Sequence, residues 1–283
     1  MTRVAAVDIG TNSTRLLVAD VDHEEIHDVV RRTRVTRLGE GVDAGRRLRP
    51  AAMERTLVAV ADYAREIEQH RIEKHRPVPT LVVATSAARD AENGSAFLHD
   101  VGSTFGFATR LLSGAEEAEL IRRGVGATAP GTLIVDVGGG STELILAETR
   151  MSIDVGSVRL TERFLRRDPP AAVELDEAAA FVRALLPELE VTAAIGVAGT
   201  VAQLHVLAGE LTREAVEGEL ARLAAMRAAE RAQLPGMDPA RAPVIVGGAL
   251  VVREVVRRYR LPQLACCERD LLDGVALAAA ASV

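Results

Sequence analysis

The sequence is poor in aromatic residues and in lysine. The first shortage limits which side chains can pack the core, and the second excludes classes of enzyme. Only 2% of the 283 residues are aromatic and none is tryptophan, so the core has to be packed from Ala, Val, Leu and Ile. All but one of the 34 basic residues are arginine, the exception being Lys74. This single lysine lies in a charged run and not in a glycine-rich loop, which excludes P-loop ATPases and most pyridoxal-phosphate enzymes.

Cysteine and long apolar runs are also scarce. The two cysteines, Cys266 and Cys267, are adjacent, which makes a disulfide between them strained. This usage is typical of a reducing compartment. An apolar strand pattern begins at Val4 with no basic-then-apolar leader before it, and no stretch of 18 apolar residues follows. We therefore expect a cytoplasmic protein with no membrane contact.

Charge is plentiful, but its distribution does not favour nucleic acid as a partner. The net charge is −6, with 48% hydrophobic and 26% charged residues, a composition typical of a folded protein. Seven arginines nevertheless gather in a short segment: Arg31, Arg32, Arg34, Arg37, Arg46, Arg47 and Arg49. The segment lacks the interleaved aromatics of nucleic-acid sites. Two interpretations of these arginines remain. They form a binding track for another polyanion, or they lie on a solvated strand and its loop.

An internal repeat is the most informative feature of the sequence. VDIGTNSTRLLVAD, residues 7–20, and VDVGGGSTELILAE, residues 135–148, are 128 positions apart and identical at seven of fourteen positions. Each copy has an apolar strand that ends in Asp, a Gly/Ser/Thr turn and a second apolar strand, which predicts a β-hairpin. Helical patterns alternate with further strands. The sequence therefore predicts an α/β fold of two duplicated domains, 1–125 and 126–283.

The two turns are candidate phosphate sites. Asp8 and Asp136 end the first strand of each hairpin, where a carboxylate can hold Mg²⁺ directly or through water. The turn after Asp136 offers backbone N–H groups that no bulky side chain covers: Gly138, Gly139, Gly140 and Ser141. The alternative for a single copy is an ordinary hairpin turn. Two related copies facing one cleft favour phosphate.

Alignment of the two copies shows one difference in charge. Arg15 of the first copy occupies the position of Glu143 in the second. Arg15 suits a phosphoryl oxygen, whereas Glu143 suits a metal ion or a positioned water. The alternative is that both lie on solvated strand faces.

A helix start at Ser113 supplies a candidate general base. Ser113 and Glu116 match a capping box, which accounts for Glu116. Glu117 has no such structural role, and the neighbouring carboxylates of Glu116 and Glu119 are expected to raise its proton affinity. The alternative is that acidic residues in a first helical turn only favour the helix dipole.

Two further strand ends carry polar groups. Arg89 follows an apolar strand at residues 81–85 and is a candidate phosphate clamp. Gly199 and Thr200 follow a strand at residues 193–197, where the N–H groups of a turn suit a second phosphate. A solvated arginine and a structural turn are the respective alternatives.

Seven motifs along the chain together resemble the exopolyphosphatase and guanosine pentaphosphate phosphohydrolase family. The motifs are DIGTNS from Asp8, TSAARD from Thr85, SGAEEAEL from Ser113, DVGGGSTE from Asp136, GSVRLTERF from Gly156, AGT from Ala198 and ERDLLDG from Glu268. The resemblance covers essentially the whole chain. It implies two ribonuclease-H-like domains of the actin, sugar-kinase and heat-shock chaperone ATPase superfamily, with the active site in a cleft between the domains.

The resemblance also implies roles for individual residues. It makes Glu117 the base that activates water, Asp136 and Glu143 ligands of metal or water, and Arg89 a phosphate-binding residue. The DIGTNS motif, with Asp8 as a further metal ligand, and the 138–141 turn match the two phosphate loops of the family. The complete set of implied substrate-binding residues is Asp8, Thr11, Asn12, Ser13, Arg15, Arg89, Gly138, Gly139, Gly140, Ser141, Gly199 and Thr200. One departure from the family is Glu119, where many relatives carry Arg.

The activity implied by the resemblance is hydrolysis of the terminal phosphoanhydride of inorganic polyphosphate, with Mg²⁺ or Mn²⁺ as cofactor. The chain lacks the extra helical domains of longer relatives, from which we expect a preference for short polyphosphate. The alternatives are a guanosine pentaphosphate 5′-phosphohydrolase, with guanosine pentaphosphate or other nucleotides as partners, a non-catalytic polyphosphate or nucleotide sensor, and a sugar or acid kinase. The resemblance further implies a homodimer.

Overall fold

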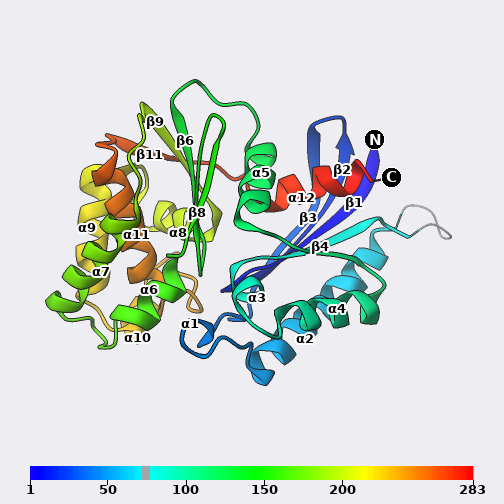
Figure 1. Cartoon of the computed structure of the whole chain (residues 1–283), viewed down its shortest axis with the longest axis horizontal. Helices are drawn as coiled ribbons and strands as arrows, with labels where there is room; N and C mark the ends of the chain where they lie inside the picture. The colour runs from blue at the N-terminus through cyan, green and yellow to red at the C-terminus, as the bar shows by residue number, and fades with distance from the viewer. Residues whose placement is uncertain (72–76, 283) are drawn as a thin grey trace. The chain divides into compact units, whose positions relative to one another are not determined.

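The computed structural model describes residues 1–71 and 77–282, and Lys74 lies outside them. It divides the chain into two compact units (Figure 1), Met1–Ala127 with Arg269–Val283, and Thr128–Glu268. The division expected after residue 125 falls two residues before the observed one. The second domain was expected to continue to residue 283, and here the structure differs. The last helix packs against a strand and a helix of the first unit, which bury its apolar side chains there.

The first unit is a five-stranded sheet with helices on both faces. Its strands are β1 (Thr2–Ile9), β2 (Ser13–Asp22), β3 (Glu25–Val35), β4 (Thr80–Ala84) and β5 (Ala108–Leu111). Its helices are α1 (Val42–Gly45), α2 (Pro50–Gln69), α3 (Ser86–Asp90), α4 (Gly94–Phe105), α5 (Gly114–Val125) and α12 (Leu271–Ala280). Helices α2 and α4 lie on one face of the sheet, and α5 and α12 on the other (Figure 1).

The second unit contains a six-stranded sheet. Its strands are β6 (Thr132–Val137), β7 (Thr142–Leu146), β8 (Thr149–Ile153), β9 (Ala193–Val197), β10 (Leu211–Thr212) and β11 (Gln263–Cys266). Its helices are α6 (Ser157–Phe164), α7 (Ala172–Leu185), α8 (Ala198–Ala208), α9 (Arg213–Ala224), α10 (Ala228–Arg231) and α11 (Ile245–Arg258). No helix in the described part of the chain is long and apolar enough to cross a membrane.

The two sheets have the same topology, which confirms the duplication. The order β3-β2-β1-β4-β5 recurs as β8-β7-β6-β9-β11, with β10 added at the far edge. In both, the first and second strands are antiparallel, and the first, fourth and fifth are parallel. This is the ribonuclease-H-like arrangement that the resemblance implies. Asp8 pairs with Arg15 and Asp136 with Glu143, so the sequence alignment and the strand register agree.

The strand alternation decides which side chains face which helices. In β1, Ala5, Val7 and Ile9 belong to the core beneath α2 and α4, so Asp8 lies on the opposite face, toward α12. In β6, Leu133, Val135 and Val137 belong to the core of the second unit, so Asp136 again lies on the opposite face. The second-last residue of β1 and of β6 is therefore an aspartate, and its side chain lies on the face of the sheet opposite this core.

The helical segment that begins at Arg213 is broken into α9 and α10. Two carboxylates cap the new helix start: Glu230 accepts a hydrogen bond from the Arg227 N–H at 2.7 Å, and Asp168 accepts one from the Ala228 N–H at 2.9 Å. Asp168 is 60 residues away in the chain. Periodicity within the segment could not predict a break that a distant carboxylate stabilises.

Candidate functional site

The turn between β1 and β2 is held from one side by the chain that follows β3. The Gly10 N–H donates to the Ser13 carbonyl at 3.0 Å and closes the turn. The carbonyl oxygen of Thr11 accepts from Gly39, and that of Asn12 accepts from Thr36 and Arg37, at 2.8 to 3.0 Å. The carbonyl groups of the turn are thus engaged by the protein itself, and the turn has one fixed conformation.

Three oxygen atoms of this turn are buried and have no hydrogen-bond partner among the described residues. They are Asp8 Oδ1, Asn12 Oδ1 and Ser13 Oγ. Each unsatisfied buried polar group costs about 1–3 kcal/mol, so several together are typical of a site that a ligand completes. The structure therefore places Asp8, Asn12 and Ser13 together, with Thr11 buried beside them, as the sequence predicted for a phosphate loop.

Arg15, which was expected to bind a phosphoryl oxygen, is bonded to two carboxylates of its own unit. Its Nε donates to Asp8 Oδ2 at 2.9 Å, and its Nη1 donates to Asp270 Oδ2 at the start of α12. Burial raises the pKa of Asp8 above its ordinary value, and the positive charge of Arg15 opposes that rise. Arg15 thus neutralises carboxylates of its own unit, because the strand register sets it directly opposite Asp8.

The turn between β6 and β7 repeats the first turn closely. The Gly138 N–H donates to the Ser141 carbonyl at 3.1 Å, the counterpart of the Gly10 bond. The start of α6 then engages the carbonyls: Val158 N–H donates to Gly139 O at 2.8 Å, and Arg159 Nε donates to Gly140 O at 2.7 Å. Both glycine turns are therefore fixed through their carbonyl groups by the segment after the third strand.

Asp136 and Glu143 face each other across the second hairpin. They are paired positions of β6 and β7, and both are buried, with exposed fractions of 5% and 1%. Ser152 of β8 donates its hydroxyl to Glu143 Oε1 at 2.8 Å and fixes that carboxylate. The structure brings these two predicted residues together as a buried pair of oxygen donors.

Glu117 is buried in the first turn of α5 and bonded to Arg89. The Arg89 Nη1 donates to Glu117 Oε2 at 3.0 Å and to the Leu112 carbonyl at 2.9 Å. Among the described residues, both hydrogen bonds of the Arg89 side chain come from Nη1, which leaves its Nε and Nη2 available for another acceptor. The two predicted residues meet because α3 begins at the end of β4 and α5 just beyond the end of β5, its parallel neighbour.

The expected cluster of like charges around Glu117 does not form. Glu116 completes the capping box with Ser113, as predicted, and pairs with Arg110 at 3.0 Å. Glu119 pairs with Arg122 at 2.7 Å. Successive residues of a helix point in different directions, so the three carboxylates each find their own partner.

Gly199 and Thr200 lie in the first turn of α8 and not in a separate loop. Thr200 is buried, and the Arg241 guanidinium packs so closely over Gly199 that a Cβ there would lie 2.4 Å from it. The helix start that follows β9 is thus covered by Arg241 from within the second unit.

Most arginines of the 31–49 segment are engaged in ion pairs. The pairs are Arg31 with Asp28 and Asp273, Arg32 with Glu66, Arg34 with Asp62, Arg47 with Glu92, and Arg49 with Glu40. Arg32 and Arg34 attach β3 to α2, whereas Arg31 attaches it to α12. These contacts favour the interpretation as a solvated strand and loop.

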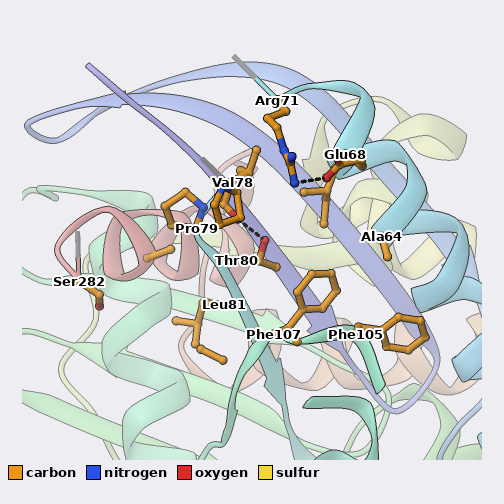
Figure 2. Close-up of a pocket in the computed structure, with 15 residues that line it drawn as sticks. Ala64, Glu68, Arg71, Val78, Pro79, Thr80, Leu81, Phe105, Phe107 and Ser282 are labelled. Carbon is orange, nitrogen blue, oxygen red and sulfur yellow. Dashed lines mark hydrogen bonds and ion pairs between the residues drawn. The ribbon is translucent and has the colours of Figure 1, made fainter. Parts of the chain in front are cut away.

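A pocket of about 510 Å³ lies at the end of the first sheet where β4 and β5 begin, opposite the end that carries Asp8 (Figure 2). Phe105 and Phe107 stack beside it with ring centroids 6.0 Å apart, and the Arg71–Glu68 ion pair lies near them. None of the predicted site residues lines this pocket. It is therefore separate from the residues at the ends of β1 and β4.

The donor set fits a hard divalent cation bound jointly with substrate. The described residues contain no group of three or more carboxylate, histidine or cysteine side chains that could hold a metal. The second unit supplies the buried Asp136–Glu143 pair, and Asp8 in the first unit has one unbonded oxygen. Mg²⁺ is usually held by one or two carboxylates together with substrate phosphates, so two carboxylates in one unit suffice.

Sequence reasoning missed three residues that support the site. Ser152 holds Glu143, Arg159 holds the Gly140 carbonyl, and Asp270 holds Arg15. Asp270 lies in the ERDLLDG motif, where an Asp before an apolar helix with a second carboxylate three residues later is a helix-start signal. Its hydrogen bond with Arg15, 255 residues away, could not be predicted from the neighbouring residues of the sequence.

Comparisons with known proteins agree with this arrangement. A model described as the Ppx/GppA phosphatase family matches residues 17–282. Exopolyphosphatase 2 of Mycobacterium tuberculosis is 42% identical over 99% of both chains. Exopolyphosphatase 1 of Mycobacterium bovis is 28% identical, over 97% of this chain and 87% of its own.

Solved structures give the same result. A crystal structure of an exopolyphosphatase-like protein has a TM-score of 0.91 and 32% identity over the whole of both chains. A structure of a Ppx/GppA enzyme from Aquifex aeolicus has a TM-score of 0.78 and 26% identity, over 98% of this chain and 99% of its own. The chain therefore belongs to the Ppx/GppA phosphatase family.

Proposed function

We propose that this protein is an exopolyphosphatase that hydrolyses the terminal phosphoanhydride of inorganic polyphosphate. The observation that carries the choice of substrate is the 42% identity, over 99% of both chains, to a protein named Exopolyphosphatase 2. In the reaction, a water oxygen forms a bond to the terminal phosphorus and the bridging P–O bond breaks. The products are orthophosphate and a chain that is shorter by one phosphate.

Glu117 is the proposed general base. Its carboxylate takes a proton from the attacking water, and the bond from Arg89 Nη1 fixes its orientation. Arg89 retains Nε and Nη2 for a phosphoryl oxygen, so one arginine both orients the base and binds substrate. A carboxylate held this way suits phosphoryl transfer, in which rate comes mainly from positioning and charge stabilisation.

The two glycine turns are the proposed phosphate-binding elements. Their carbonyl groups are occupied by the segments after β3 and β8, and the N–H groups of Thr11, Asn12, Gly139 and Gly140 donate no hydrogen bond within the described residues. Free backbone N–H groups in a rigid turn bind phosphate oxygens. The unbonded Asn12 and Ser13 side chains extend this binding in the first turn.

Exopolyphosphatases of this family generally depend on a divalent metal ion. We propose Mg²⁺ or Mn²⁺, held by Asp136 and Glu143 with Asp8 as a further ligand. The cation, when bound, neutralises charge on the phosphoryl oxygens. Ser152 keeps Glu143 oriented for this task through its 2.8 Å hydrogen bond. The expectation that residues of both units act on one phosphoryl group stays a prediction.

A substrate panel tests the proposed function. Phosphate release is measured from short polyphosphate, long polyphosphate, guanosine pentaphosphate and ATP at equal concentrations of terminal phosphate. The proposal expects the highest kcat/KM on polyphosphate, and on short chains in particular. A higher kcat/KM on guanosine pentaphosphate would replace it with the nucleotide phosphohydrolase, and binding without turnover would replace it with the sensor.

Two further properties belong to the same proposal. Cys266 and Cys267 are both free thiols, which agrees with the reducing cytoplasm as the location. A homodimer follows from the resemblance of the sequence to its family, and the molar mass in solution tests it.

A further inference from the structure

Helix α12 begins at a pair of buried carboxylates, each of which has two tasks. Asp270 Oδ1 accepts the Leu272 N–H at 2.9 Å, and Asp273 Oδ2 accepts the Asp270 N–H at 2.9 Å, so one oxygen of each caps the helix. Both carboxylates also reach the sheet: Asp270 Oδ2 accepts from Arg15 on β2, and Asp273 accepts from Arg31 on β3, with Oδ1 at 2.8 Å and Oδ2 at 3.4 Å. The two aspartates are thus alike in burial and capping but bind different strands.

The Asp270 contact continues to the first phosphate-binding turn. Arg15 bridges Asp270 and Asp8, and the three side chains are 15% exposed or less. Arg15 bonds Oδ2 of Asp8, and Asp8 Oδ1 is buried with no hydrogen-bond partner in the part of the chain that the structure describes. A guanidinium offers a fork of donors that can cover both oxygens of one carboxylate. Because Asp270 engages Nη1, Arg15 is held on one oxygen of Asp8 and the other stays open.

The same helix start is fixed against the helix that carries Glu117. A Cβ on Gly124 of α5 would lie 2.0 Å from the Asp270 carbonyl, and one on Gly274 of α12 would lie 1.9 Å from the Leu120 carbonyl. Backbones can approach this closely because both positions are glycine, which has no Cβ. The first turn of α12 therefore determines both the contact between Arg15 and Asp8 and the position of α5 against α12 within the first unit.

We propose that Asp270 is a positioning residue of the hydrolase site, which holds Arg15 so that the Asp8 carboxylate presents its open oxygen in the phosphate-binding turn. The inference rests on the proposed function, since it requires Asp8 to act there. Asp270 is buried and its carboxylate bonds Arg15 and the Leu272 N–H, so its effect on the reaction is expected to pass through Arg15. A misplaced Asp8 carboxylate is expected to affect the reaction more than the binding of polyphosphate, because the backbone N–H groups of the two turns still bind the substrate.

The test compares Asp270→Asn with Asp273→Asn in the full chain. Asn is as good an N-cap as Asp, so Asp270→Asn removes the charge that holds Arg15 and keeps the cap oxygen. We expect kcat for short polyphosphate to fall about 10-fold with KM changed less than about twofold, the size of effect seen for residues that orient ligands. Asp273→Asn, the matched control, keeps kcat within about twofold of wild type.

A double variant tests whether Asp270 acts through Arg15. We expect Arg15→Gln to lower kcat and Arg15→Gln with Asp270→Asn to lower it no further, since coupled residues are non-additive. Independent, multiplying losses would overturn the inference. If Arg15→Gln does not fold, the comparison of the two single variants decides: equal kcat values for Asp270→Asn and Asp273→Asn would overturn the inference. In that case a wild type that releases phosphate still supports the proposed function. A wild type without phosphate release removes the proposed function and this inference with it.

Discussion

Replacement of Glu117 by Gln removes the proposed base while it preserves the shape of the site. The glutamate side chain is 8% exposed and accepts one hydrogen bond from Arg89 at 3.0 Å, a bond that a glutamine oxygen can also accept. The charge lost belongs to a pair whose arginine is 22% exposed, so we expect a stability loss of only about 1 kcal/mol. That is small against a typical total of about 5–15 kcal/mol.

The expected loss of rate is far larger. A general base contributes about 10²–10⁴-fold, so kcat for short polyphosphate should fall by that factor, or about 3–5 kcal/mol in barrier height. Steady-state phosphate release measures it, with a thermal melt to confirm the fold. Glu116→Gln on the same helical turn is the matched control, since Gln also completes a capping box. Turnover by Glu117→Gln within threefold of the control would refute the assignment.

Three further outcomes follow from the structure. Removal of divalent metal with a chelator should abolish phosphate release and Mg²⁺ should restore it; release that persists in excess chelator would remove the cation from the account. Gly274→Ala should lower stability by about 1–3 kcal/mol or more, since its Cβ would lie 1.9 Å from the Leu120 carbonyl, whereas Gly218→Ala in α9, with no atom within 4 Å, should raise it by about 0.5–1 kcal/mol; equal melting shifts would contradict this. The hydrogen bond from Arg3 lowers the pKa of Asp20, so this pair stabilises the fold above the ordinary Asp pKa of about 3.9, and the contribution is lost as the pH falls; Asp20→Asn should therefore reduce the free energy of unfolding by about 1 kcal/mol at pH 7 and by less at pH 3, as urea titrations would measure.

Local pattern carries much of the fold. The repeat at 128-residue spacing predicted two hairpins whose registers match, because the same apolar alternation and the same turn residues recur in both. The capping box at Ser113 was also predictable, since all its atoms lie within four residues. These features depend on neighbours in sequence, which a single chain displays directly.

Features that depend on distant partners could not be predicted. The bond from Arg15 to Asp270, 255 residues away, has no signal in the sequence around Arg15, and its expected contact with phosphate stays a prediction. The placement of α12 in the first unit depends on the Gly124 and Gly274 contacts between helices far apart in sequence. Glu116 and Glu119 were expected to surround Glu117 with like charge, but Glu117 is bonded to Arg89, 28 residues away, because tertiary packing brings the two together.

The most direct test of the central claim is product analysis of wild-type protein with short polyphosphate in ¹⁸O-labelled water. The account predicts that orthophosphate appears from the first time point, that each phosphate cleaved from a chain longer than pyrophosphate carries one ¹⁸O atom, and that the remaining chains shorten by one phosphate at a time. Fragments from the middle of the chain, unlabelled orthophosphate while the chains are still longer than pyrophosphate, or no release at all would contradict it.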